Sequence, residues 1–126
     1  MLNKVILMGR LTREPELRHT QSNVPVVSFS LAVERGFSNG EERQSDFINI
    51  VAWRSTAEFV AKWFSKGQLV AVSGKLQVRS YKDREGYNRT ATEVVADEVF
   101  FAERKREFQE PLNTGELFGE GEELPY

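Results

Sequence analysis

Hydrophobic and polar residues alternate with a period of two along much of the chain up to residue 101, a pattern typical of β-strands. The most informative segment spans residues 46–54. Successive side chains of a strand point to opposite faces. One face of this strand is therefore predicted to be aliphatic and suited to a core, with Ile48, Ile50 and Ala52. The other face carries Phe47, Asn49, Val51 and Trp53.

This second face, with Arg54 just beyond it, allows two interpretations. Its rings, amide and guanidinium suit a platform on which a planar, anionic ligand stacks. Alternatively, the strand is buried on both faces and its aromatic side chains only fill space. The segment by itself favours burial on both faces, and the rest of the chain shifts the balance toward a binding platform.

Further strands are predicted on both sides of this segment. Gly9 and Gly74 lie inside two of them, where an interior glycine indicates a bulge or a bend. Residues 16–19 form a short extension after the first strand. The predicted strands cover residues 4–12, 24–35, 68–81 and 88–101, in addition to 46–54. Turn-forming or charged residues separate strands at positions 21–23, 38–42 and 82–86.

Between the third and fourth strands the hydrophobic period becomes helical, and a helix is predicted over residues 56–66. Residues 55–58, Ser-Thr-Ala-Glu, have the form of a capping box. Gly67 is the expected residue just past the helix C-terminus. Trp63 lies on the apolar face of this helix and is assigned to packing. That face comprises Phe59, Val60, Trp63 and Phe64.

Five strands with one helix between the third and the fourth predict an all-β protein, and a small OB-fold barrel is the natural candidate. A β-sandwich is the alternative, although five strands would make a thin one. The patterning stops near residue 104. Residues 1–104 are therefore predicted to form the OB-fold domain, and residues 105–126, rich in Gly, Pro and Glu, a disordered acidic tail.

The composition argues against several classes of protein. The chain has no cysteine and a single histidine, His19, which excludes disulfides, a thiol nucleophile and zinc sites built from several His or Cys. Because the sequence contains no catalytic motif, we expect no enzymatic activity and neither a cofactor nor a metal. No apolar run approaches the ~20 residues that span a bilayer. We therefore expect a cytoplasmic protein without a membrane segment.

The net charge of −2 hides an asymmetry. Residues 1–106 hold 17 basic and 13 acidic residues, whereas residues 107–126 hold 6 acidic residues and no basic ones. Four aromatic residues are poorly explained by the core, and each has cations close by in the sequence. Aromatic rings interleaved with cations are what sequence-independent binding of a single nucleic-acid strand requires, because every base can stack and every phosphate is anionic. These four are Phe37, Phe47, Trp53 and Tyr81.

Several motifs stand in a familiar order and at familiar separations: Asn3–Thr12, Pro15–Arg18, Asp46–Asn49, Trp53-Arg54, Lys66-Gly67, Gly74–Leu76 and Thr92–Ala96. Through them the chain closely resembles the bacterial and phage single-stranded DNA-binding proteins, SSB, especially those of Gram-positive bacteria, over about residues 1–103. The resemblance implies an OB-fold, a homotetramer built as a dimer of dimers, and no catalysis. It also implies a role in replication, recombination and repair of DNA, in the nucleoid.

The resemblance also assigns roles to residues. Phe37, Phe47, Trp53 and Tyr81 stand at the family's base-stacking positions. Cations at or beside the positions that face the DNA backbone are Lys4, Arg10, Arg54, Arg79 and Arg89. Arg35 is added to these backbone cations because it lies close to Phe37 in the sequence. The family's acidic C-terminus docks on replication, recombination and repair proteins. The corresponding residues here are Glu122, Glu123, Leu124, Pro125 and Tyr126, with Tyr where the family usually has Phe.

Two other binding modules stay open as alternatives. An RNA-binding OB-fold predicts a preference for RNA and no need for an acidic tail. A primosomal-type OB-fold interaction subunit predicts dimers that associate with a helicase complex and wrap little DNA. A small enzyme is the least favoured class, because no catalytic constellation can be assembled from these residues.

Overall fold

The computed structural model describes residues 1–36 and 44–103. The predicted hairpin loop at 38–42 and the predicted acidic tail lie outside these residues. The described elements are β1 (Val5–Leu11), β2 (Glu16–His19), β3 (Pro25–Glu34), β4 (Ser45–Trp53), α1 (Arg54–Trp63), β5 (Leu69–Lys82) and β6 (Asn88–Phe101).

Five of the strands close into a barrel. They follow one another in the order β1-β5-β6-β4-β3, and a second pairing of β1 with β3 completes the ring. The β4–β6 pair is parallel and the other pairs are antiparallel. The predicted five-stranded OB-fold is therefore confirmed, and the sandwich alternative is wrong. The short extension at residues 16–19 is a separate strand, β2, which pairs with β3 outside the ring.

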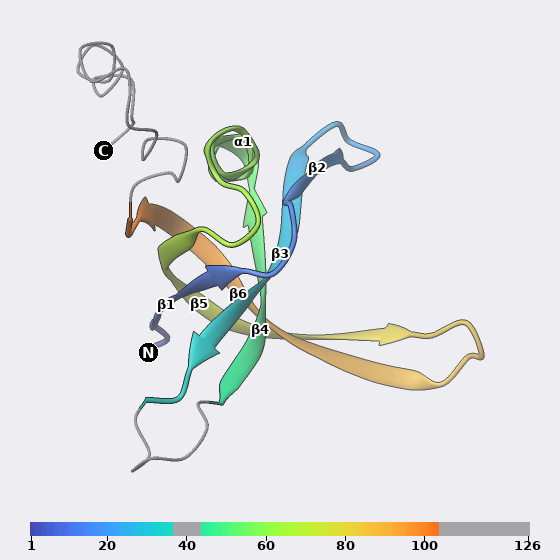
Figure 1. The fold of residues 1–126 in the computed structure, drawn as a ribbon. Helices are drawn as coiled ribbons and strands as arrows, with labels where there is room; N and C mark the ends of the chain where they lie inside the picture. The colour runs from blue at the N-terminus through green and yellow to red at the C-terminus, as the bar shows by residue number, and fades with distance from the viewer. Residues whose placement is uncertain (37–43, 104–126) are drawn as a thin grey trace, which may run out of the picture.

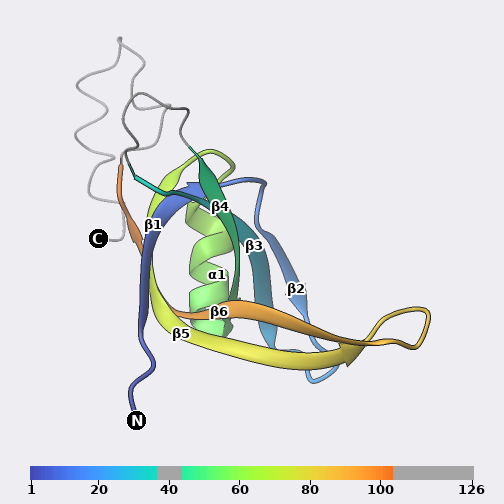
Figure 2. The same ribbon diagram turned by 90° about the horizontal axis from the view of Figure 1, so that it is seen from below.

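Alternate residues of the strands fill the barrel, and α1 covers one end of it (Figures 1 and 2). Phe59 of the helix and Phe64, the residue just after it, contact the Phe101 ring at the end of β6, with ring centroids 6.0 and 4.7 Å away. Trp63 is only half-buried, and the Nζ atom of Lys62 lies 5.3 Å from its ring centroid. The fully buried core side chains are Leu11, Val27, Phe29, Leu31, Ile50, Val60, Val70, Val72 and Val94.

Both interior glycines lie where two backbones approach too closely for a side chain. A Cβ atom on Gly9 would lie 2.4 Å from the carbonyl oxygen of Ala32, beside the point where β1 also pairs with β3. A Cβ atom on Gly74 would lie 2.2 Å from the carbonyl oxygen of Val95. The register of the β5–β6 pair shifts between Ser73 and Gly74, which confirms the irregularity predicted at Gly74.

The predicted helix boundaries are wrong. The helix begins at Arg54, directly after β4, with Trp53 as the N-cap and no capping hydrogen bond from a side chain. The capping box therefore does not form, because Ser55 already lies inside the first helical turn. At the other end Phe64 is extended (φ −114°, ψ 151°) and buried, so the helix stops before the position that would make Gly67 its C-terminal glycine. The Gly67 N–H instead donates to the carbonyl oxygen of Leu11 at 2.8 Å.

The β5–β6 hairpin is long and extends away from the barrel as an arm (Figures 1 and 2). Asp83 organises its turn, because one carboxylate oxygen accepts the backbone N–H groups of Glu85 and Tyr87, each at 3.0 Å. No helix in the part of the chain that the structure describes is long and apolar enough to cross a membrane.

Candidate nucleic-acid interface

The outward face of β4 is exposed at both of its aromatic positions. Phe47 is 72% exposed and Trp53 41%, whereas Ile50 and Ala52 on the inward face are fully buried. Only Val51 on the outward face is buried, at 9% exposure. Burial of β4 on both faces, which the segment by itself favoured, is therefore wrong.

The strand beside β4 keeps the surface around Phe47 open. Ala32 of β3 lies opposite Phe47, and Ser30 lies opposite Asn49. Directly opposed residues in a sheet have Cβ atoms about 4.5–5.5 Å apart, so a large neighbour would cover the rings. Because these neighbours are small, the Phe47 ring stands clear of the sheet.

The third predicted aromatic residue lies on the arm. Tyr81 of β5 is 43% exposed and pairs with Arg89 of β6. The register links the two regions: Val51 of β4 pairs with Val95 of β6, and Val95 pairs with Lys75 of β5. Since every second residue of a strand shares a face, Tyr81 lies on the same sheet face as Lys75 and so as the exposed rings of β4. Phe37, the fourth predicted aromatic residue, lies outside the described residues.

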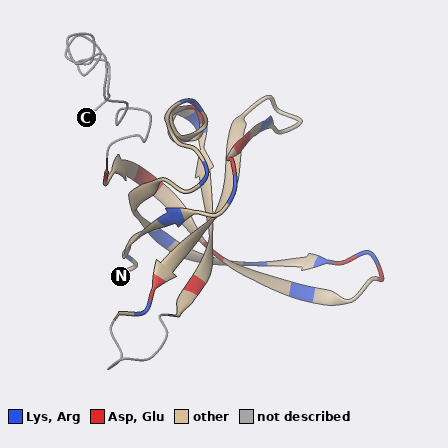
Figure 3. Ribbon diagram, in the orientation of Figure 1, with Lys and Arg blue, Asp and Glu red and all other residues tan. Residues whose placement is uncertain are grey.

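Most of the predicted cations are paired with acidic side chains, so charges of both signs occur along the strands (Figure 3). These contacts join residues from different strands or from the two ends of a hairpin, which sequence patterns do not show. The ion pairs are Arg10–Glu103 (2.6 Å), Arg35–Asp46 (2.9 Å), Arg79–Glu93 (2.9 Å) and Arg89–Asp83 (2.9 Å).

Two predicted cations differ from these four. Lys4 and Arg54 are exposed, and neither forms an ion pair with any residue in the described ranges 1–36 and 44–103. Arg54 has a positive φ of 58°, a backbone conformation that residues other than glycine rarely adopt. This strained residue follows Trp53 directly, at the point where β4 becomes α1.

The ion pairs at the strand ends change the acidity of their carboxyls. The hydrogen bond from Arg35 holds the pKa of Asp46 below its usual range, and the same pairing raises the pKa of Arg35. The hydrogen bond from Arg89 lowers the pKa of Asp83, and the backbone N–H donors of the arm turn lower it further. These carboxyls are therefore ionised, and hold their arginines, at neutral pH.

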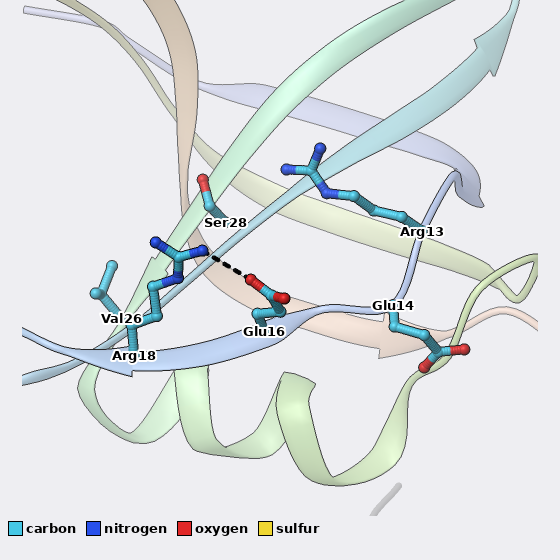
Figure 4. A pocket seen from close by; sticks show the side chains of 6 residues that line it. All are labelled: Arg13, Glu14, Glu16, Arg18, Val26 and Ser28. Carbon is cyan, nitrogen blue, oxygen red and sulfur yellow. Dashed lines mark hydrogen bonds and ion pairs between the residues drawn. The ribbon is translucent and has the colours of Figure 1, made fainter.

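Sequence reasoning missed a groove beside Trp53. It has a volume of about 640 Å³ and lies over β2, β3 and the segment that precedes β2 (Figure 4). The signal that could have found it is the spacing of Glu16 and Arg18, two charged residues on one face of a short strand. The lining residues are Arg13, Glu14, Glu16, Arg18, Val26 and Ser28.

Comparison with known proteins confirms the resemblance predicted from the sequence. "Single-stranded DNA-binding protein 1" of Staphylococcus aureus (strain MSSA476) is 56% identical over 106 residues, which cover 83% of this chain and 68% of that protein. The "Single-stranded DNA-binding protein" of Halalkalibacterium halodurans is 48% identical over 122 residues, covering 96% of this chain and 73% of that protein. The "Single-stranded DNA-binding protein" of Caldanaerobacter subterraneus subsp. tengcongensis is 52% identical over 109 residues, covering 86% of this chain and 73% of that protein.

The family model described as the single-strand binding protein family matches residues 2–102. This range includes all the described strands and the helix. The chain therefore belongs to the single-strand binding protein family.

Proposed function

We propose that this protein binds single-stranded DNA without regard to sequence, and coats and protects it during replication, recombination and repair. The observation that carries the proposal is the exposure of Phe47, Trp53 and Tyr81 on one face of the sheet. Apolar groups that gather on an exposed face often mark an interaction site. Relatives at about 50% identity are named single-stranded DNA-binding proteins, which supports the same assignment.

In this mechanism bases stack on the rings and phosphates meet the cations. Stacking is worth about 1–3 kcal/mol per base and tolerates any base, because each has a π-face. The stacking residues are Phe37, Phe47, Trp53 and Tyr81, and Phe37 is included on sequence grounds alone. The backbone cations are Lys4, Arg10, Arg35, Arg54, Arg79 and Arg89.

The paired arginines make phosphate binding an exchange reaction. A phosphate that reaches Arg35 must compete with Asp46, whose oxygen accepts from both Nε and an Nη atom at 3.0 and 2.9 Å. Exposed pairs of this kind are weak, typically about 0–1 kcal/mol, so a DNA strand held by stacking can displace them. Lys4 and Arg54 bind phosphate without such competition from a described residue.

The protein assembles as a homotetramer, a dimer of dimers, in this proposal. An apolar patch on the outer face of the barrel supports association: Ile6 is 72% exposed, Met8 57% and Phe100 46%. Met8 and Phe100 both pair with Ala71, from opposite sides, so the patch is continuous across three strands. Sedimentation analysis should show Met8→Glu dissociating the assembly, with Leu17→Glu, 40% exposed on β2, as the control.

Residues 1–104 form the DNA-binding and assembly domain, and residues 105–126 recruit partner proteins. The docking residues are Glu122, Glu123, Leu124, Pro125 and Tyr126, which lie outside the described residues. Deleting Glu122–Tyr126 should abolish pull-down of replication and repair proteins while DNA binding is retained. Unchanged pull-down would contradict this part of the proposal. The protein acts in the cytoplasm, at the nucleoid, without catalysing a reaction.

The decisive experiment is a fluorescence titration with a long oligo-dT. The variant Trp63→Phe removes the second indole, so that Trp53 alone reports binding. We expect strong quenching by oligo-dT, little by duplex DNA, and an affinity that falls with salt. A preference for oligo-U over oligo-dT would favour an RNA-binding module instead. Absence of binding to every oligonucleotide would overturn the proposal, and a dimer that binds without wrapping would favour a primosomal-type subunit.

A further inference from the structure

The groove beside Trp53 is continuous with the exposed face of β4. Val26, one of its lining residues, pairs with Trp53 on one side and with Arg18 on the other. Trp53, Val26 and Arg18 therefore form one row across β4, β3 and β2, on one face of the sheet. Neighbouring strands lie about 4.8 Å apart, so Arg18 is only two strand spacings from the ring.

The groove presents donors that suit a phosphate. The side chains of Arg13 and Arg18 approach it from opposite ends, with the Ser28 hydroxyl between them (Figure 4). A guanidinium offers a planar fork of N–H groups that matches two phosphate oxygens. Glu14 is turned away from these donors, and its carboxylate accepts the backbone N–H of Lys66 at 3.1 Å.

One carboxylate remains in the groove. Glu16 accepts a hydrogen bond of 2.8 Å from Arg18, and the two side chains are 71% and 76% exposed. The contact lowers the pKa of Glu16, mainly through the Arg18 hydrogen bond, with a smaller contribution from Arg13. Since both partners are so exposed, the pair is easily displaced.

We infer that a single strand stacked on Trp53 continues into this groove, where Arg13 and Arg18 bind its phosphate and Glu16 occupies Arg18 when no strand is present. This inference rests on the proposed function, and it adds a nucleotide subsite that lengthens the path of DNA across each subunit. The Ser28 hydroxyl donates to the same phosphate.

The test compares two double variants that each remove two positive charges. Arg13→Ala/Arg18→Ala changes the groove, and Lys62→Ala/Lys66→Ala, on and after α1, is the matched control. Both are titrated with oligo-dT of increasing length at several salt concentrations. We expect the groove variant to bind long oligomers about tenfold or more weakly than the control, because its charge-assisted hydrogen bonds to phosphate are removed. Oligomers too short to pass Trp53 should bind both variants alike.

Two further readouts separate phosphate binding from a structural effect. The salt dependence of the groove variant for long oligomers should be shallower by about 0.7 for each phosphate that the groove no longer neutralises. Glu16→Gln, which keeps the shape but frees Arg18, should bind long oligomers more tightly than the unaltered protein. If the groove variant matches the control at every length and salt, and Glu16→Gln changes nothing, the inference is overturned while the proposed function stands. Failure of the unaltered protein to bind any oligomer overturns both.

Discussion

Arg79 donates a hydrogen bond from Nε to the Oε1 atom of Glu93 at 2.9 Å, and the Glu93 side chain is only 10% exposed. The same guanidinium lies 5.5 Å from the ring centroid of Tyr81. A buried carboxylate needs a charged partner, so Arg79 is held in place between an acid and an aromatic ring. The positive charge of Arg79 is therefore already paired with Glu93 when no DNA is bound.

Replacing Glu93 should change how salt affects DNA binding. In the unaltered protein a phosphate must compete with Glu93 for Arg79. Glu93→Gln keeps the size of the side chain but removes the competing charge. We expect the plot of log affinity against log salt to steepen by about 0.7, the value of one phosphate contact on a single strand. Glu98→Gln, an exposed acid on the same strand, is the control for the change in net charge. An identical slope in the two variants would contradict the prediction.

The close backbone contact at Gly74 predicts a large loss of stability on adding a methyl group. In Gly74→Ala the Cβ atom would overlap the carbonyl oxygen of Val95, so two strands must move apart. Overpacking of this kind typically costs about 1–3 kcal/mol in the free energy of unfolding. Gly86→Ala meets no neighbour within 4 Å, and its φ of 87° adds only strain of about 1–2 kcal/mol. Urea unfolding that ranks Gly86→Ala as the more damaging change would refute this argument.

Two substitutions of Arg54 should distinguish the effect of its positive φ on stability from the effect of its charge on DNA binding. Arg54→Gly relieves the backbone strain, and we expect the free energy of unfolding to rise by up to about 1 kcal/mol. Arg54→Ala keeps the strain and should show no such gain. Both variants lose the cation, so both should bind oligo-dT more weakly and to the same extent. Equal stability of the two variants by urea unfolding would mean that the strain is relaxed elsewhere.

The acidity of Asp83 should depend on Arg89. Because the folded pKa of Asp83 is depressed, its pairing contributes stability above the unfolded pKa of about 3.9 and loses it as pH falls through the lower folded value. Carboxyl carbon NMR should show the pKa of Asp83 moving up toward its usual range in Arg89→Ala. The pKa should still remain somewhat below its usual range, because the backbone N–H groups of Glu85 and Tyr87 still donate to the carboxylate. An unchanged pKa in this variant would show that the ion pair is absent in solution.

The alternation along residues 46–54 predicted which side chains share a face of β4, although the segment by itself wrongly favoured burial of both faces. It placed Ile50 and Ala52 in the core, and together with family motifs it singled out Phe47 and Trp53 as surface rings, both of which are exposed. Local chemistry was a weaker guide at the helix. Ser55 could not cap it, because β4 runs directly into α1 and places that residue in the first turn.

The strands, the barrel class and the apolar faces followed from the sequence, because they depend on side-chain periods that repeat within a few residues. Only the tertiary structure showed which cations form ion pairs and where the groove lies. Arg10 and Glu103 are 93 positions apart, and Trp53 meets Val26 and Arg18 only through strand pairing. Such contacts arise when the chain closes into a barrel, and no local pattern encodes which distant residues that closure brings together.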